Sequence, residues 1–381
     1  MQMNGLIKQI KRRIEMLNKK YSTKLCEIMV KSNIDVLMIG PSVDLEFLTN
    51  FSPSICERFQ AFFLLSNGEC FHISPQLYLE EAEKYLGSRT DIFMWKDSDI
   101  FIDAISIASQ KYHLNGKTIA INNAIRGIDL IDIEEILNAK FINGHDILEN
   151  LRVIKDGGEI EKLRESAKIA DKVMGETIDC ISPGITEGDI AKKIEELFMQ
   201  KGAEGLAFKP AVISGPNSSE PHYKKHSRTI KEKDIIILDM GCKYKGYCSD
   251  ISRTVFVGGI TDEEKKVYDI ILRANEAGEK MAKQGVVAED VDKASRDIIE
   301  GEGYGQYFLN RTGHGIGITV HEAPYIRTGN KQRLEKGMAF SVEPGIYMQN
   351  KFGMRIEDIV VIGTDGPEVL NNFTKEIIVI K

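Results

Sequence analysis

The sequence predicts two domains of different class, an α/β domain over residues 1–150 and an α+β domain over residues 151–381. The length of 381 residues is sufficient for two domains. Residues 1–150 alternate short apolar runs with stretches of helical spacing, and this pattern changes near Leu151–Gly158, where a long amphipathic helix begins at about Glu159. The second part contains an internal repeat, which predicts two similar halves.

Strands and helices alternate in the first domain. Runs rich in Ile, Val and Phe predict strands at Ile34–Gly40, Ala61–Ser66, Cys70–Ser74 and Thr118–Asn122. Helical spacing predicts helices at Gln76–Leu86 and Ser98–Tyr112. This order is typical of an α/β domain.

The second domain repeats itself at an offset of 101 residues between the segments Ile181–Lys193 and Lys283–Ala294. Four positions agree: Gly184, Asp189, Ile190 and Lys192 correspond to Gly285, Asp290, Val291 and Lys293. Each copy ends a long helix at glycine and opens a shorter helix, and strand-like sequence follows. The repeat therefore predicts two halves, each with a helix pair followed by sheet.

Composition excludes several functions. The net charge of -7 disfavours nucleic acid as a partner, because phosphate binding requires clustered basic surface. No apolar run approaches the roughly 20 residues of a membrane span. The six cysteines form no C-x-x-C pair, which favours a reduced, cytoplasmic compartment. The basic N-terminus is interpreted as a solvated amphipathic helix.

The segment Asp234–Phe256 reads as a hairpin with its loop at Lys243–Gly246. Pairing outward from that loop puts Asp239 opposite Asp250, with Cβ atoms about 5 Å apart. Two facing carboxylates repel each other, and aspartate is unfavourable in strands. A positive group is therefore expected between them.

The second half repeats this arrangement in Met338–Ile362, where folding about Asn350 brings Glu343 opposite Glu357. Each acid alone reads as an exposed strand residue. The flanking apolar runs nevertheless imply burial, and a buried carboxylate without a partner is costly. Four converging carboxylates therefore predict a bound metal.

The remaining ligand is expected to be a neutral nitrogen. His314 lies within a run of glycines, Gly313–Gly317, which lets backbone pack tightly around a site. A lone histidine is usually structural, but His321 lies close by in the string VHEAP.

These residues resemble the metal-ligand set of the pita-bread metallopeptidases, a group that includes methionine aminopeptidase, aminopeptidase P and prolidase. The five positions, in chain order, are Asp239, Asp250, His314, Glu343 and Glu357, in the strings LDMG, YCSDISRT, GHGIG, VEPGIY and RIED. Further matches to the aminopeptidase P and prolidase branch are His222, His321 and Arg355. The resemblance implies a creatinase-like α/β N-terminal domain and a pita-bread (creatinase/aminopeptidase-like) α+β catalytic domain.

The resemblance also implies a binuclear metal site. Asp239 is expected to bind one ion, Asp250 and Glu357 to bridge both ions, and His314 and Glu343 to complete the other. The oxygen-rich donor set favours Mn²⁺, with Co²⁺ or Fe²⁺ next and Zn²⁺ less suited.

Catalytic roles follow from the same resemblance. Glu343 is expected to move the proton of the attacking water, and His321 to stabilise the oxyanion. His222 is expected to bind and orient substrate, and Arg355 to contribute to substrate binding. The expected substrates are proline-containing dipeptides or short peptides, and the expected assembly is a homodimer.

Three alternatives remain open beside an Xaa-Pro dipeptidase. Aminopeptidase P, which trims longer peptides, is nearly as well supported. A metal-free pita-bread relative and a methionine aminopeptidase are less well supported. A dipeptidase requires a cation for the substrate carboxylate, and Arg58 is the candidate; its alternative is a surface arginine paired with Glu57.

Overall fold

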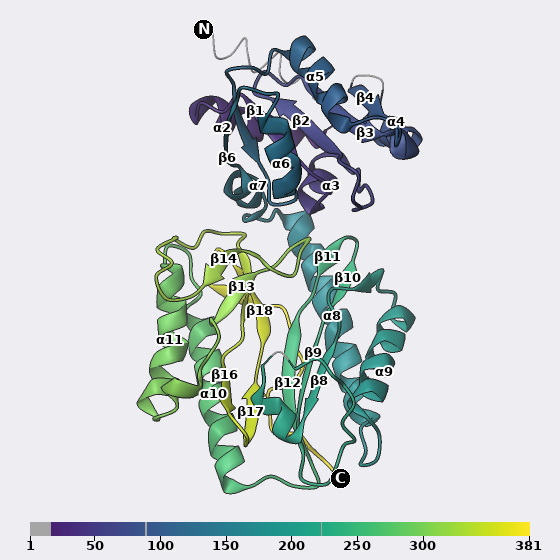
Figure 1. Ribbon diagram of the computed structural model, residues 1–381. Coiled ribbons are helices and arrows are strands. Elements are labelled where there is room, and N and C mark those ends of the chain that lie inside the picture. Colours follow the sequence, from purple (N-terminus) through teal and green to yellow (C-terminus); the bar gives the residue numbers. More distant parts are fainter. Residues whose placement is uncertain (1–16, 88–89, 222) are drawn as a thin grey trace. The chain divides into compact units, whose positions relative to one another are not determined.

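The computed structural model describes residues 17–87, 90–221 and 223–381, and its contacts divide the chain into two compact units, Met1–Leu151 and Arg152–Lys381 (Figure 1). The predicted basic helix at the N-terminus falls largely outside the described residues.

The N-terminal unit is built on a six-stranded mixed sheet in the order β4-β3-β2-β1-β5-β6. Its central strands β1, β2 and β3 pair antiparallel, and the outer pairs are parallel. The four predicted strands are all present, whereas β4 and β6 were missed. The strand bounds are β1 Val36–Ile39, β2 Ala61–Leu65, β3 Cys70–Pro75, β4 Asp91–Trp95, β5 Thr118–Ile121 and β6 Lys140–Asn143.

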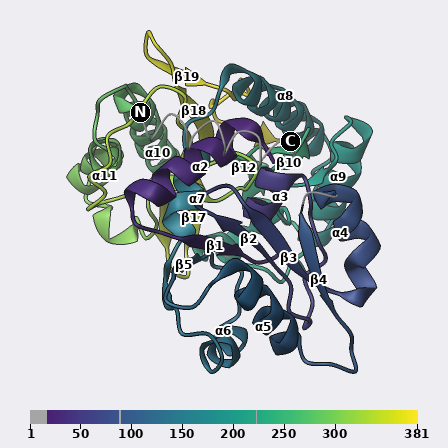
Figure 2. The same cartoon turned by 90° about the horizontal axis from the view of Figure 1, so that it is seen from above.

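Helices cover both faces of this sheet. In β1, Leu37 and Ile39 pack into one apolar cluster with α2 and α3, whereas Val36 and Met38 pack into another with α5 and α6 (Figure 2). Alternation along the strand thus buries both faces, as in an α/β layer structure. The helix bounds are α2 Lys19–Lys31, α3 Val43–Thr49, η1 Gln76–Tyr78, α4 Leu79–Leu86, α5 Phe101–Tyr112, α6 Gly127–Glu134 and α7 His145–Arg152.

A buried histidine makes the stability of this unit depend on pH. His72 of β3 is fully buried and meets the ring of Phe51 edge-on, with centroids 5.6 Å apart. Burial lowers the pKa of His72 from 6.5 to about 3. Below pH 6.5 His72 therefore becomes protonated in the unfolded chain, whereas it stays neutral in the folded unit until the pH approaches about 3. The contribution of His72 to the free energy of unfolding is therefore fully present above pH 6.5 and is lost as the pH falls toward about 3.

We expect the replacement His72→Phe to remove this loss. At about pH 4.5 the loss in the wild type amounts to roughly 3 kcal/mol. The free energy of unfolding of the variant, relative to that of the wild type, should therefore rise by this amount between neutral pH and about pH 4.5. The single tryptophan, Trp95, lies in β4, and its fluorescence during urea unfolding reports this unit selectively. The matched control is His113→Asn, at an exposed position. A difference that does not change with pH would contradict the assignment.

The C-terminal unit contains two similar helix pairs, as the repeat predicted. Helices α9 and α11 begin 101 residues apart, at Glu187 and Ala288, and both have 14 residues. Figure 1 shows α8 and α9 on one side of the strands and α10 and α11 on the other. Among the described residues no helix is long and apolar enough to cross a membrane. The bounds are α8 Gly157–Asp179, α9 Glu187–Gln200, α10 Asp262–Met281, α11 Ala288–Gly301, η2 Gly215–Ser219 and η3 Gly305–Tyr307.

Helix starts in this unit are marked by capping boxes. Thr261 and Glu264 form the capping box of α10, and Asp156 and Glu159 form that of α8, which begins two residues before the predicted start. Each box satisfies backbone N–H groups that a helix start leaves without partners.

The strands between the helix pairs form sheets in the orders β20-β12-β9-β8, β14-β13-β15-β18-β19, β11-β10-β7 and β16-β17. An isolated bridge between Ser252 and Glu357 joins strands of the two halves. The bounds are β7 Gly205–Leu206, β8 Ala211–Ser214, β9 Ile235–Met240, β10 Cys242–Tyr244, β11 Tyr247–Cys248, β12 Ile251–Val257, β13 Gly313–Gly315, β14 Glu322–Ile326, β15 Ala339–Val342, β16 Gly345–Met348, β17 Phe352–Arg355, β18 Asp358–Ile362, β19 Pro367–Val369 and β20 Val379–Ile380.

The predicted register of the first hairpin was wrong by two residues. The loop consists of Lys245 and Gly246 alone, with φ values of 47° and 78°. Positive φ at both central residues is the requirement of a type I′ turn, which closes a hairpin in two residues. As a result Asp239 pairs with Ser252 and not with Asp250. A shift of two residues keeps a strand's side chains on the same face.

The second hairpin has the predicted register. Strands β16 and β17 fold about Asn350, whose φ is 61°, and pair Gly345 with Arg355. The same register continues in β15 and β18, where Val342 pairs with Asp358. Glu343 directly follows Val342 and Glu357 directly precedes Asp358, so the two glutamates lie opposite each other in the predicted register.

Candidate metal centre

The five predicted ligands lie in or beside strands from both halves of the C-terminal unit. Glycine permits this approach at β13, since a Cβ atom on Gly313 would collide with the backbone oxygen of Ser341 in β15. The ligands are Asp239 in β9, Asp250 directly before β12, His314 in β13, Glu343 directly after β15 and Glu357 directly before β18.

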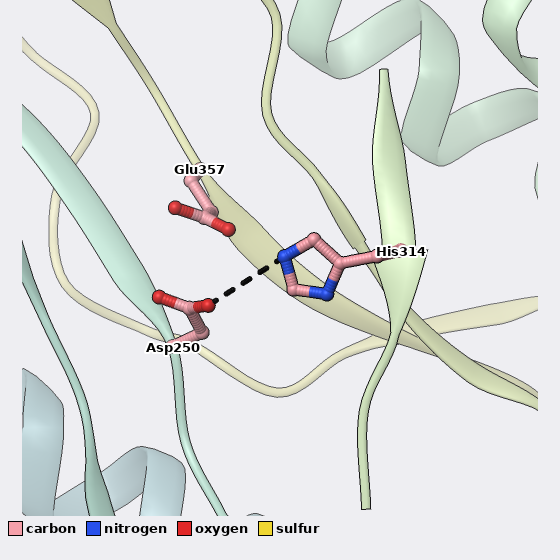
Figure 3. A group of neighbouring side chains, drawn as sticks. All are labelled: Asp250, His314 and Glu357. Carbon is pink, nitrogen blue, oxygen red and sulfur yellow. Dashed lines mark ion pairs between the residues drawn. The ribbon is translucent and has the colours of Figure 1, made fainter. Parts of the chain in front are cut away.

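Three of these side chains point toward one another (Figure 3). One ligand atom from each of Asp250, His314 and Glu357 lies within 4.8 Å of the others, and all three residues are buried. The Nε2 atom of His314 is 3.8 Å from Asp250 Oδ2 and 3.3 Å from Glu343 Oε1. The Nδ1 atom of His314 lies 3.1 Å from the carbonyl oxygen of Gly315. Because a carbonyl only accepts, Nδ1 carries the hydrogen and Nε2 faces the carboxylates as a free lone pair.

The donor atoms fit a divalent cation. Asp239 Oδ1, Asp250 Oδ1 and Glu357 Oε1 are each buried without a hydrogen-bond partner. Buried polar atoms are nearly always paired, so three such oxygens in the same cluster indicate a binding site for a positive charge. A hard, oxygen-rich set with one imidazole is suited to divalent metal ions.

The electrostatics of the cluster agree with this fit. Burial raises the pKa of Asp250 well above its ordinary value, and the neighbouring Glu357, Asp239 and Glu343 raise it further. Burial and the other carboxylates likewise raise the pKa of Glu357. Burial raises the pKa of Glu343 to about 7, against the opposing charge of Arg355. The protein alone thus disfavours the charged forms of Asp250, Glu343 and Glu357, and bound cations would remove that cost.

The histidine is held neutral. Burial lowers the pKa of His314 to about 3, and the adjacent His321 contributes in the same direction. The two rings meet edge to face with centroids 4.3 Å apart. Neutral imidazole is the form that binds a metal. His321 itself is exposed, so its ring lies at the outer side of the cluster.

All three guanidinium nitrogens of Arg355 donate hydrogen bonds to other residues of the protein. It donates to Asp239 Oδ2 at 2.6 Å, to the Tyr347 hydroxyl at 2.9 Å and to Ser252 Oγ at 2.8 Å. Burial alone would lower the pKa of Arg355, but Tyr347 and the carboxylates outweigh it and raise that pKa. Substrate binding by Arg355 stays a prediction, and its contact with Asp239 orients that carboxylate.

Sequence reasoning missed a second layer of contacts. The Ser252 hydroxyl donates to Glu357 Oε2 at 2.7 Å, and Arg253, 1% exposed, donates to the Glu357 carbonyl at 2.8 Å. Arg253 also binds Asp358 at 2.7 Å, and Lys375 lies 2.8 Å from the other oxygen of Asp358. This buried network fixes the backbone that carries Glu357. The available signal was the string SDISRT, in which Ser252 follows Asp250 on the same strand face.

The backbone after His321 is also fixed by buried charge. Glu322 accepts from Lys155 Nζ at 2.7 Å, and each side chain is 1% exposed. The Thr319 hydroxyl donates to the other oxygen of Glu322 at 2.9 Å, and the same hydroxyl oxygen lies 3.3 Å from the His321 carbonyl oxygen. These contacts hold the loop that presents His321.

The two remaining predicted site residues are His222 and Arg58. His222 lies outside the described residues. Arg58, in the N-terminal unit, donates twice to Asp97 at 2.8 Å and once to Glu57 at 2.6 Å. Its pairing with Glu57 is the alternative that the sequence had left open.

Buried carboxylates and a neutral imidazole on two repeated halves characterise a metal-dependent hydrolase. A model of metallopeptidase family M24 matches residues 161–364, more than half of the chain, and a model of the creatinase/prolidase N-terminal domain matches residues 22–154. The chain therefore belongs to metallopeptidase family M24.

Individual relatives are similar over nearly the whole chain. The Xaa-Pro dipeptidase of Lactobacillus helveticus is 34% identical, covering 94% of this chain and 98% of the relative. The prolidase structure from Thermococcus sibiricus is 36% identical with a TM-score of 0.89, covering 93% of this chain and 97% of that one. The X-Pro aminopeptidase structure from Thermotoga maritima is 33% identical with a TM-score of 0.81, covering 94% and 99%.

We expect Ser252→Ala to weaken metal binding without removing a ligand. The variant deletes the hydroxyl that orients Glu357, and loss of such partners typically costs about 10- to 100-fold in metal affinity. The measurement is a calorimetric titration of chelated protein with Mn²⁺. Ser295→Ala is the control, because Ser295 is equally buried but donates to the Ala274 carbonyl, away from the acids. Equal affinity in both variants would refute the role of Ser252.

Proposed function

We propose that this chain hydrolyses the peptide bond between a residue and a following proline, with dipeptides preferred over longer peptides. The observation that carries the proposal is the group of buried carboxylate oxygens without partners around the neutral imidazole of His314. The relatives named Xaa-Pro dipeptidase and prolidase support the substrate class.

In this proposal four carboxylates and one imidazole would hold two divalent ions. Asp239 would contribute to holding one ion, His314 and Glu343 would contribute to holding the other, and Asp250 and Glu357 would contribute to holding both. Such ions, when bound, supply Lewis-acid activation of a water and of the scissile carbonyl. Mn²⁺ suits the donor set best, with Co²⁺ or Fe²⁺ next and Zn²⁺ less suited.

Glu343 is proposed to move the proton. Ser341 Oγ lies 3.2 Å from Glu343 Oε1, and this contact fixes the orientation of the carboxylate. Glu343 takes a proton from the attacking water and delivers it to the proline nitrogen, which has no hydrogen of its own in the peptide. Without that proton the nitrogen would leave as a strongly basic anion.

His321 is proposed to donate a hydrogen bond to the oxygen that gains negative charge, and His222 to bind and orient the substrate. The rigid loop made by Lys155, Glu322 and Thr319 supports this role for His321, because a preorganised donor is effective only when it cannot turn away. Arg355 orients Asp239 from below.

A peptide panel tests the proposal. Chelation should abolish hydrolysis of Leu-Pro, and Mn²⁺ or Co²⁺ should restore it more fully than Zn²⁺. Leu-Ala should be a much poorer substrate than Leu-Pro. Comparable turnover of Leu-Ala and Leu-Pro would reject the proline requirement.

The second candidate is an aminopeptidase P, which the likeness to the X-Pro aminopeptidase structure favours. The tripeptide Arg-Pro-Pro separates the two, because faster turnover of it than of Leu-Pro would assign the longer substrate. A metal-free relative would bind no Mn²⁺ in a titration.

The proposal also includes a homodimer in a reducing, cytoplasmic compartment. All six cysteines are free thiols, which supports the compartment. Light scattering of the purified protein measures the assembly.

A further inference from the structure

A dipeptide carries its free carboxylate one residue from the bond that is cut, so a dipeptidase has to accept an anion beside its acidic cluster. Asp239, Asp250, Glu343 and Glu357 would repel that anion, and an adjacent cation is needed. The cations already considered are occupied. Arg355 gives its nitrogens to Asp239, Tyr347 and Ser252, and Arg58 gives its nitrogens to Asp97 and Glu57.

Arg311 remains, three residues before His314. Its guanidinium lies 5.0 Å from the centre of the Tyr325 ring, and it forms no ion pair with any residue that the structure describes. The side chain is half-buried. An arginine held over an aromatic face keeps its planar fork available for a carboxylate.

The backbone places Arg311 next to Glu343. The Glu343 amide donates to the Thr312 carbonyl at 2.7 Å, and the Asn310 side chain donates to the carbonyls of both Arg311 and Glu343, at 3.0 and 3.2 Å. Asp292 in turn accepts from the amide and hydroxyl of Thr312. These contacts hold the backbone of Arg311 beside that of Glu343.

We propose that Arg311, supported by the ring of Tyr325, binds the free carboxylate of the substrate's C-terminal residue and thereby selects dipeptides. The inference rests on the proposed Xaa-Pro activity and assigns the group that limits substrate length. In a longer peptide an uncharged amide replaces that carboxylate, and the charge-assisted contact is lost.

The test compares Leu-Pro with Leu-prolinamide, which lacks the negative charge. The wild type should prefer Leu-Pro by about 10- to 100-fold in kcat/KM, the range of a hydrogen bond to a charged group. Arg311→Met should lose most of this preference by slowing Leu-Pro alone, and Arg311→Lys should be intermediate because lysine lacks the bidentate fork. L-Proline should raise the melting temperature of the metal-loaded wild type but not of Arg311→Met.

The matched control is Arg327→Met, an exposed arginine two residues beyond Tyr325, which should keep the preference. Metal content is measured in every variant. An unchanged preference in Arg311→Met overturns the inference, as does an equal loss for both substrates together with loss of metal. If Arg311→Met lost turnover of Glu-Pro selectively, Arg311 would instead bind the side chain of the residue before proline, and this result would also overturn the inference. A wild type inactive on both proline substrates would overturn the proposed function as well.

Discussion

Asp250→Asn is expected to bind less metal than the wild type and to lose peptidase activity by about 10³-fold or more. The variant removes a charge from the proposed bridge between two ions, and the Lewis-acid contribution of such ions is worth several kcal/mol. Metal content by elemental analysis and kcat for Leu-Pro measure the two effects. Full metal occupancy in the purified variant would remove the main support for the ligand set.

The stability of the same variant separates loss of a ligand from damage to the fold. In metal-free wild type the buried Asp250 is crowded by Glu357, Asp239 and Glu343, which raise its pKa. Asparagine relieves this repulsion, so the metal-free variant should melt no lower than the metal-free wild type, and added Mn²⁺ should stabilise it less.

The control is Asp234→Asn, because Asp234 is also buried in this unit but is paired with Arg228 at 2.8 Å. Breaking that pair should lower the melting temperature at unchanged metal content. If both variants behave alike, the acids near His314 are ordinary structural carboxylates.

His321→Ala is expected to lower kcat for Leu-Pro by roughly 10²–10³, as for loss of one oxyanion donor, while metal content stays at the wild-type value. The ring of His321 is exposed beside His314, so its removal leaves the buried ligand atoms in place. His321→Gln keeps an N–H donor and should recover part of the rate.

Comparing the change in kcat with the change in metal content in His321→Ala shows the role of His321. If metal content falls together with kcat, His321 is a ligand and the assignment of His314 has to be revised. If kcat is unchanged, another group stabilises the oxyanion, and the rigid loop of Lys155 and Glu322 has a different purpose.

Local sequence patterns were sufficient for much of the fold. Apolar alternation located β1, β2, β3 and β5, because a strand buried on one or both faces must carry apolar residues at fixed spacing. The repeat at Gly184 and Gly285 located both helix pairs. The predicted helix ends were wrong, because α8 ends at Asp179 and α10 at Met281, and the two glycines lie with positive φ in the turns that follow. Strands β4 and β6 were missed because their burial is only partial.

The sequence by itself singled out four carboxylates and one imidazole as candidate ligands, because acids between apolar runs and a histidine among glycines are unusual, and the structure brings Asp250, His314 and Glu357 close together. It also determined the register about Asn350. Only the tertiary structure decided the first hairpin, where the backbone at Lys245 adopts a positive φ that no residue pattern announces. Only the tertiary structure decided that Arg355 is hydrogen-bonded within the protein, whereas Arg311 packs over the ring of Tyr325. Arg355 meets Asp239 across 116 residues, and Arg253 meets Asp358 across 105, so these charges are paired by packing between the two halves and not by neighbours in sequence.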